Sequence, residues 1–312
     1  MSEGGGDVGT AVIFPGQGTQ EPGMAAPWVD DPAWEVVERA EQALAEPLAP
    51  LVLADEASLT RTRDAQLAVL VTSLICWEAV RTRCAVDPTA FAGHSLGQVT
   101  ALIASGAVDF ESGVQFAARR AELTQEAADR HPGRMIACIG ADIDQAEEAC
   151  GAAPEACWIA NDNAPGQIVL AGTPEGIDAA TDVARDVGIR RVLPLDVGGA
   201  FHTPLMNDAS EALSAELSEV SFGTGSAPVV SNEDAEVYND ADGWRDRLAH
   251  HVVRPVRWRA VMETLVSLGA DPWWEIGHGS MLAGLAKRGA SGVTVRGVAT
   301  PSDLDDLRSV RS

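Results

Sequence analysis

Basic residues are scarce in this chain of 312 residues. Only 22 lysines and arginines face 46 aspartates and glutamates, which gives a formal net charge of −24. Nucleic-acid binding needs a basic surface, so this balance argues against a nucleic-acid partner. An anionic partner would need a local cluster of basic side chains, and the densest candidates are Arg190, Arg191, Lys287 and Arg288.

Cysteines and long apolar runs are also few. The five cysteines are odd in number and lack Cys-x-x-Cys or Cys/His spacing, so we expect reduced, buried thiols and no metal site. No stretch reaches the roughly 18 consecutive apolar residues that a membrane span needs. Residues 1–9 lack the basic start and apolar run of a signal peptide. The expectation is a cytoplasmic protein with no membrane partner.

Apolar residues make up 46% of the chain, enough for a full core, and their pattern alternates between strand and helix. Short β-rich runs at 10–14 and 89–92 alternate with apolar helical segments at 65–80 and 96–106. This alternation predicts an α/β fold with a parallel sheet at its core.

The pattern changes between residues 133 and 196. Strand and helix signals there follow the order βαββαβ, with a turn expected at 161–165 between the two central strands. This order predicts a ferredoxin-like subdomain of residues 133–196, inserted into a large domain made of residues 1–132 and 197–312.

The segment "GHSLG" at 93–97 fits the G-x-S-x-G nucleophile elbow, a tight turn between a strand and a helix. Side chains at Gly93 and Gly97 would collide in such a turn. The Leu96 N–H, at the start of the following helix, could stabilise an oxyanion. An ordinary turn in which Ser95 only caps the helix remains possible on this segment alone.

A serine nucleophile needs a base, and His202 is the best placed of the six histidines. It follows the inserted unit at the return to the large domain, where a cleft is expected. His94 adjoins the serine and should point away from it, and His131 lies in a polar loop. A packed or helix-capping role for His202 remains open.

Arg120 lies on the apolar face of a predicted helix at 109–127, beside Phe116 and Leu123. Burying a guanidinium without a partner is unfavourable, so an anion should come from elsewhere. That anion is either a structural carboxylate or the carboxylate of a substrate.

Further motifs occur in a fixed order along the chain. They are "FPGQGTQ" (14–20), "DAQLAVL" (64–70), "GHSLG" (93–97), "ANDNAPGQIVLAG" (160–172), "GAFHTPLM" (199–206), "VSNEDA" (230–235), "RPVRW" (254–258) and "EIGHGSMLAGLAKR" (275–288). Together with Arg120, 25 residues after the serine, they resemble the malonyl-CoA:acyl carrier protein transacylases and the related acyltransferase domains of polyketide synthases. The resemblance runs from about residue 10 to residue 309.

The resemblance implies an α/β-hydrolase-like large domain and a role for each matching residue. Ser95 would accept the acyl group, His202 would act as its base, and Arg120 would pair with the malonyl carboxylate. The remaining implied positions are the oxyanion-hole residues Gln17 and Leu96, the site-lining residues Gln66 and Asn232, and, at the cleft edge, Asn161 and Asn163.

In the polyketide acyltransferases that the chain resembles, a phenylalanine directly before the histidine, as at Phe201, goes with malonyl rather than methylmalonyl. Some malonyl-specific members of the family carry serine there, and a packing role for Phe201 between the domains remains open. Three positions depart from the family's pattern. Gln98 stands where glutamate is frequent, His251 where glutamine is frequent, and His278 where proline is usual, so neither His251 nor His278 is expected to be the base.

The implied reaction moves malonyl from malonyl-CoA to the phosphopantetheine thiol of acyl carrier protein, without a cofactor and in a monomer. Two alternatives share some of these features. A thioesterase of the α/β-hydrolase class has the same elbow, although it has no use for Arg120. A transacylase subunit of a malonate decarboxylase would keep both the serine and the arginine.

Overall fold

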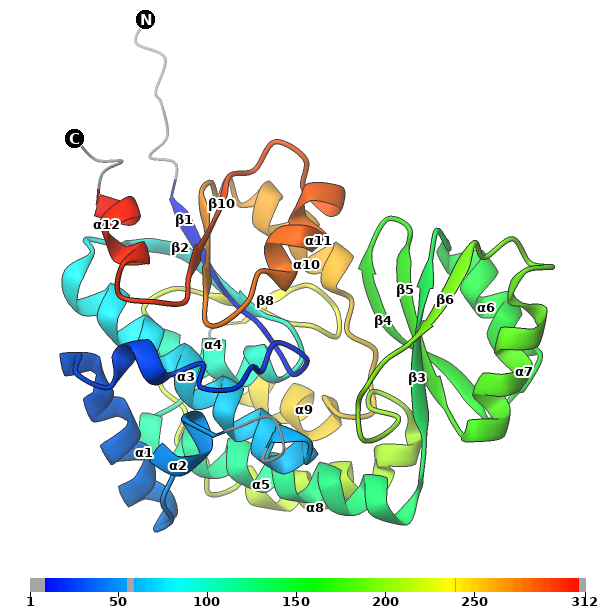
Figure 1. The fold of residues 1–312 in the computed structure, drawn as a ribbon, viewed down its shortest axis with the longest axis horizontal. Coiled ribbons are helices and arrows are strands. Elements are labelled where there is room, and N and C mark those ends of the chain that lie inside the picture. Colours follow the sequence, from blue (N-terminus) through cyan, green and yellow to red (C-terminus); the bar gives the residue numbers. More distant parts are fainter. Residues whose placement is uncertain (1–8, 55–58, 239, 309–312) are drawn as a thin grey trace, which may run out of the picture.

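Two β-sheets organise the chain (Figure 1). The computed structural model describes residues 9–54, 59–238 and 240–308. Residues 1–8 of the N-terminal stretch that lacks signal-peptide features, and residues 309–312 of the expected large domain, lie outside them. The larger sheet has the order β10-β9-β1-β2-β7-β8 and is parallel except for the β7–β8 pair. Its strands are β1 (Thr10–Phe14), β2 (Pro88–Gly93), β7 (Val229–Val230), β8 (Val237–Tyr238), β9 (Trp273–Ile276) and β10 (Val295–Val298). The predicted α/β fold with a parallel core sheet is confirmed.

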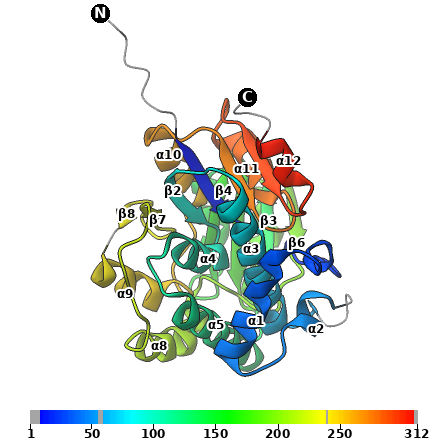
Figure 2. The ribbon, with the colours of Figure 1, turned by 90° about the vertical axis from the view of Figure 1, so that its left-hand side faces the viewer.

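Helices cover both faces of this sheet (Figures 1 and 2). Successive residues of β1 point to opposite faces, so Val12 and Phe14 join one apolar cluster while Ala11 and Ile13 join another. The first cluster contains residues of α3, α4 and α5, and the second contains residues of α10 and α11. The helices of this part are α1 (Glu35–Leu44), α2 (Ala49–Val52), α3 (Thr62–Arg83), α4 (Leu96–Ser105), α5 (Phe110–Arg130), α8 (Asn207–Glu216), α9 (Ala241–His250), α10 (Trp258–Ser267), α11 (Met281–Gly289) and α12 (Asp303–Arg308), with 3-10 turns η1 (Ala26–Trp28), η2 (Pro32–Trp34) and η4 (Pro204–Met206).

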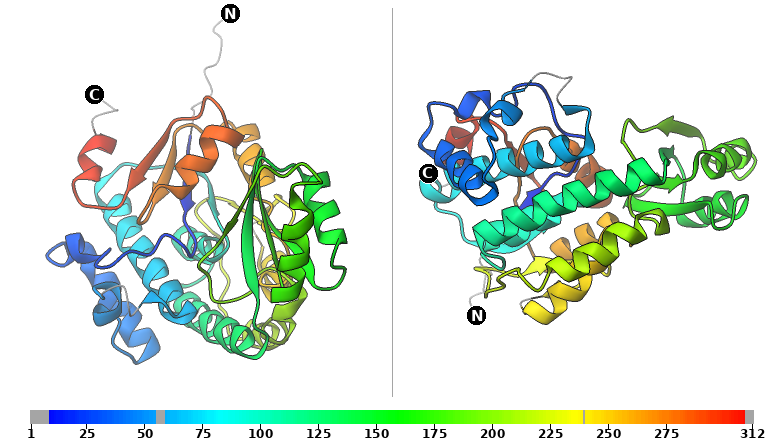
Figure 3. Two further views of the ribbon diagram at one scale, coloured as in Figure 1. Left: turned by 45° about the vertical axis from the view of Figure 1, so that its right-hand side comes forward. Right: turned by 90° about the horizontal axis from the view of Figure 1, so that it is seen from below.

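Helix α3 passes through the middle of the large core (Figure 3). Among the described residues it is the one helix long and apolar enough to cross a membrane, but 89% of its most apolar window is buried inside the protein. Its apolar character therefore reflects its place in the core.

The second sheet lies to one side of the first and is antiparallel throughout, with the order β4-β5-β3-β6 (Figure 3). Its elements are β3 (Arg134–Ile139), α6 (Ile143–Gly151), β4 (Cys157–Ala164), β5 (Gln167–Gly172), α7 (Pro174–Ala184) and β6 (Arg191–Pro194). They share an apolar cluster that contains Ile136, Leu170 and Ile177. The division at residues 133 and 196 stays a prediction, which this separate sheet and core support.

The predicted turn at 161–165 is wrong in its extent. Strand β4 continues to Ala164, with Asn161 and Asp162 paired to β5. The strand is longer than expected because it also pairs with the large domain. The Asp162 N–H donates to the Val256 carbonyl, and the Val256 N–H donates to the Ala160 carbonyl, both at 2.9 Å. This added pairing extends the strand beyond the point at which local sequence would end it. It also ties the second sheet to the segment after α9.

Candidate active site

Ser95 occupies a strained turn between β2 and α4. Its backbone angles, φ of 51° and ψ of −112°, lie outside the regions that residues other than glycine commonly adopt. The glycines permit this turn, because a Cβ on Gly93 would lie 1.9 Å from the Gly97 carbonyl oxygen, and a Cβ on Gly97 would lie 2.2 Å from that of Phe14. The Ser95 hydroxyl is thereby presented at the carboxyl end of β2.

His202 meets Ser95 from the loop that leaves the second sheet. The distance from its Nε2 to the Ser95 Oγ is 2.8 Å, and its Nδ1 lies 2.9 Å from the carbonyl oxygens of both His251 and Arg254. Carbonyl oxygens only accept hydrogen bonds, so Nδ1 carries the proton and Nε2 is left to accept from the serine hydroxyl. Two backbone carbonyls thus orient the imidazole, in the place that a carboxylate takes in a Ser-His-Asp triad.

The His202 imidazole is buried and stays neutral. Burial lowers its pKa to about 3, and the positive charge of Arg120 and the nearby His94 add to this effect. The hydrogen bonds to the two carbonyls act in the opposite direction and do not outweigh burial. A neutral imidazole that accepts from a serine hydroxyl is the form needed for general-base chemistry.

Arg120, on α5, points into the same site and is 3% exposed. It donates to the Gln66 side-chain oxygen, and its Nη2 lies 3.4 Å from the Ser95 Oγ. Its Nε has no hydrogen-bond partner, and within the described residues Arg120 forms no ion pair. Burial lowers its pKa to about 10, which leaves it charged at neutral pH. The site therefore contains a buried positive charge that no described carboxylate neutralises.

A cavity of about 690 Å³ opens at these side chains. It lies between the two sheets, because its walls combine residues of the large domain with Met135, Ala137 and Val169 of the second sheet. The expected site residues that line it are Gln17, Gln66, Ser95, Leu96, Arg120, Asn161, Asn163, Phe201 and His202. Within the described ranges, no three His, Cys, Asp or Glu side chains gather into a group that could hold a metal.

The sequence model of the acyl transferase domain matches residues 11–289. The chain belongs to the acyl transferase family. It is 34% identical over 302 residues to a malonyl CoA-acyl carrier protein transacylase of Synechocystis sp., covering 96% of this chain and 99% of the relative. It is 33% identical over 301 residues to the protein of the same name from Escherichia coli K12, covering 94% and 97%.

Solved structures agree with this assignment. The malonyl CoA-acyl carrier protein transacylase of Coxiella burnetii superposes with a TM-score of 0.92 at 30% identity, covering 97% of each chain. A second match is a type II PKS acyl-carrier protein in complex with its malonyl-transacylase, with a TM-score of 0.91 at 32% identity, covering 96% of this chain and 98% of that one. The resemblance seen in the sequence motifs is thus confirmed over most of the chain.

Asn232 was expected to line the active site of this acyl transferase, but it lies behind the Ser95 turn instead. It is fully buried and is not among the cavity-lining residues; its side chain instead accepts from the Ser95 N–H and donates to the Gly93 carbonyl, both at 2.8 Å. Its own N–H donates to the Gln98 side chain at 2.6 Å. Asn232, itself bonded to Gln98, therefore fixes the backbone of the elbow through hydrogen bonds rather than lining the cavity.

The structure also shows the contacts of two histidines of the acyl transferase, His94 and His251, that were not expected to act as the base. His94 lines the same cavity as Ser95, and its Nε2 lies 2.7 Å from the side-chain oxygen of Asn163. His251 is buried, and its Nε2 lies 3.4 Å from the Asn232 side-chain oxygen. Its Nδ1 has no hydrogen-bond partner among the residues that the structure describes. The cavity walls Met135, Ala137 and Val169 carry no local signal that could have predicted them.

Proposed function

We propose that this acyl transferase moves a malonyl group from malonyl-CoA to the phosphopantetheine thiol of an acyl carrier protein, through a malonyl-serine intermediate. The observation that carries the proposal is Arg120, a buried cation without a described carboxylate partner, with its guanidinium 3.4 Å from the Ser95 hydroxyl. An acyl group attached to Ser95 that ends in a carboxylate would supply the missing anion.

The first half-reaction acylates the enzyme. His202 Nε2 accepts the Ser95 hydroxyl proton as the oxygen attacks the thioester carbonyl of malonyl-CoA. The Leu96 N–H, one of the donors that a helix start leaves without an intrahelical partner, and the Gln17 N–H would hold the oxyanion. The imidazolium then returns its proton to the sulfur of CoA as the C–S bond breaks, which leaves malonyl-Ser95 and free CoA.

The second half-reaction runs the same steps with a different thiol. His202 takes the proton of the phosphopantetheine thiol as its sulfur attacks the malonyl ester, and Ser95 leaves with that proton. The result is a ping-pong reaction in which no cofactor takes part. Phe201, buried at the cavity wall next to the base, would leave little room for a methyl branch on the acyl α-carbon.

The carrier protein would meet a local basic patch in spite of the net charge of −24. The exposed side chains Arg190, Arg191, Lys287 and Arg288, hereafter the basic patch, come from both parts of the chain. Arg190 lies against Gly140, whose N–H donates to the Gly166 carbonyl at 2.7 Å. Arg288 donates to the side chain of the next residue, Gln167, at 2.6 Å. Gln167 itself lines the cavity, so the patch borders the opening.

We place this monomeric enzyme in the cytoplasm.

Intact-mass spectrometry after mixing with malonyl-CoA tests the proposal. One malonyl adduct that maps to Ser95, disappears in Ser95→Ala and transfers to carrier protein is the expected result. Release of free malonate without carrier protein would instead indicate the thioesterase alternative. Isolation of the chain only within a decarboxylase complex would indicate the malonate decarboxylase subunit.

A further inference from the structure

The catalytic pair is held by two neighbouring segments that do not touch the reacting atoms themselves. Residues 231–236, between β7 and β8, carry Asn232, which binds the elbow at the Ser95 N–H and the Gly93 carbonyl. The turn after α9 carries the carbonyls of His251 and Arg254, which hold the His202 ring. The geometry between Ser95 and His202 therefore depends on how these two segments sit against each other.

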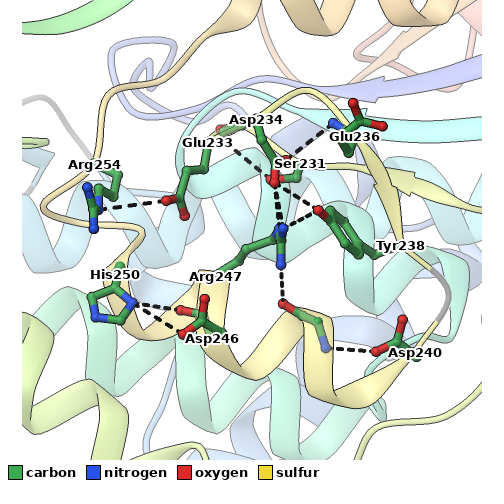
Figure 4. A network of polar contacts seen from close by, with 12 residues as sticks. Ser231, Glu233, Asp234, Glu236, Tyr238, Asp240, Asp246, Arg247, His250 and Arg254 are labelled. Carbon is green, nitrogen blue, oxygen red and sulfur yellow. Dashed lines mark hydrogen bonds and ion pairs between the residues drawn. The ribbon is translucent and has the colours of Figure 1, made fainter.

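One side-chain cluster joins the two segments, and we name it the brace: Asp234, Tyr238 and Arg247. Arg247 projects from α9 toward the other two residues (Figure 4). Its Nε and Nη2 donate to the Asp234 Oδ2 at 3.1 and 2.5 Å, and the Tyr238 hydroxyl donates to the same oxygen at 2.8 Å. The guanidinium also lies 3.5 Å from the centre of the Tyr238 ring and contacts its hydroxyl.

The brace is a partly buried structure rather than a loose surface pair. The side chains of Arg247 and Asp234 are 18% and 30% exposed, so solvent screens their attraction less than at an exposed site. Burial alone would raise the pKa of Asp234, but the bonds from Arg247 and Tyr238 outweigh it and hold the pKa at about 2. Asp234 thus stays ionised at every pH at which the enzyme would work.

Other contacts between the segments are weaker or purely backbone. The Arg254 Nε lies 3.7 Å from Glu233, and the Arg254 side chain is 56% exposed, so this pair contributes little. The Arg257 N–H donates to the Asn232 carbonyl at 2.9 Å, which fixes one point of the loop but not its outer end. The brace ties that outer end to α9 at Arg247, four residues before His251 and seven before Arg254, whose carbonyls hold His202.

We propose that Asp234, Tyr238 and Arg247 are positioning residues for acyl transfer, which set the Ser95–His202 geometry through Asn232 on one side and the 251–254 carbonyls on the other. The acyl-transfer part of this inference rests on the proposed function. The geometry itself can be read without that substrate, because an activated serine also reacts with a fluorophosphonate probe, in which Ser95 oxygen bonds to phosphorus and fluoride leaves.

The test compares Arg247→Met, which keeps the aliphatic stem and removes the charged fork, with a matched control on the same helix. Arg245 also lies over an aromatic ring, 4.8 Å from the centre of Phe222, and pairs with Asp242 at 3.6 Å, so Arg245→Met is that control. For Arg247→Met we expect about a tenfold or greater loss in fluorophosphonate labelling and single-turnover malonylation rates. The KM for malonyl-CoA should stay within about twofold, and Arg245→Met should match the wild type.

Two further variants keep the inference falsifiable. Tyr238→Phe removes one hydroxyl and keeps the ring, so it should fold and show a smaller loss in the same two rates. Arg247→Lys restores the charge without the fork and should recover part of the rate. If Arg247→Met or Tyr238→Phe lowers only the melting temperature and leaves both rates unchanged, the brace is merely structural and the proposal is overturned. A wild type that labels with fluorophosphonate but takes no malonyl refutes the proposed function and leaves the brace testable by labelling.

Discussion

At the scale of single residues, Arg120 and His202 decide the chemistry that the cavity can perform. Both are buried, and burial favours the neutral form of each. Arginine remains charged because its ordinary pKa is so high, whereas histidine becomes a neutral base. The same environment therefore produces one fixed cation and one proton acceptor beside Ser95.

Replacing Arg120 with alanine should change which acyl group the enzyme accepts. A malonyl carboxylate would lose its buried charge-assisted partner, at a cost of about 2–5 kcal/mol, whereas an acetyl group has no such contact to lose. Acylation rates for malonyl-CoA and acetyl-CoA, measured separately, should show a steep loss for malonyl and an unchanged or higher rate for acetyl. An equal loss for both would mean that Arg120 has a structural role only.

The pH profile should reflect the low pKa of His202, about 3. A free imidazole would protonate below about pH 6.5 and lose its activity as a base, but a base with a pKa near 3 remains neutral. We therefore expect kcat/KM, which reports the free enzyme, to stay flat from about pH 8 down to about pH 5. Arg120→Ala removes one cause of the shift and should move the acid limb to higher pH. A wild-type limb centred near pH 6.5 would contradict this reading.

At the scale of elements, the elbow depends on close packing between α4 and the strands beside it. The Gly97 position has no room for a side chain, since an added Cβ would meet the backbone oxygens of Phe14 and Pro15 at 2.2 and 2.7 Å. Backbone atoms of a buried strand cannot move aside as a flexible side chain can. The helix must therefore shift, and with it the Leu96 N–H.

Gly97→Ala should for this reason destabilise the fold by about 1–3 kcal/mol and reduce acylation of Ser95. Urea denaturation gives the free energy of unfolding, and intact mass gives the acylation rate. Gly284→Ala is a matched control, because Gly284 lies inside helix α11 and an added Cβ would meet no described atom outside its own helix backbone within 4 Å. That variant should gain about 0.5–1 kcal/mol in stability and keep its activity. Equal effects of the two variants would argue against a packing origin.

At the scale of the whole molecule, net charge and local charge act against each other. A net charge of −24 would repel an acidic carrier protein, and in the proposed docking the basic patch would attract it. Attraction at short range dominates only if the docked carrier lies within about a Debye length, 8–10 Å, of the patch. The sign of the salt dependence shows which of the two effects prevails.

We expect malonyl transfer to carrier protein to slow as salt rises, and the double variant Lys287→Gln, Arg288→Gln to weaken that dependence. Stopped-flow transfer from preformed malonyl-enzyme isolates this step. The control is Arg81→Gln, since Arg81 is exposed on α3 and lies about 22 Å along the helix from the cavity residue Gln66. A transfer rate that rises steadily with salt in the wild type would exclude docking at the basic patch.

The fold class, the family and the candidate residues could all be predicted from the amino-acid sequence. Alternating strands and helices predict a parallel α/β core, the G-x-S-x-G spacing favours a tight turn, and the ordered motifs indicate the family. The apolar face around Arg120 indicated a buried cation before any partner was known. The extent of β4 was not predictable in this way, since residues 160–162 pair with Val256, which lies 94 positions beyond Asp162 in the chain.

The contacts between those residues, by contrast, depend on the folded chain. Ser95 and His202 are separated by 107 residues, and their 2.8 Å contact exists because one buried loop and one turn fix the elbow and the imidazole. Backbone carbonyls orient His202, and a carbonyl leaves no signature in a sequence because every residue has one. For the same reason, the sequence did not predict that Asn232 contacts the elbow rather than the cavity. The type of side chain limits which hydrogen bonds are possible, but the folded chain sets the partners.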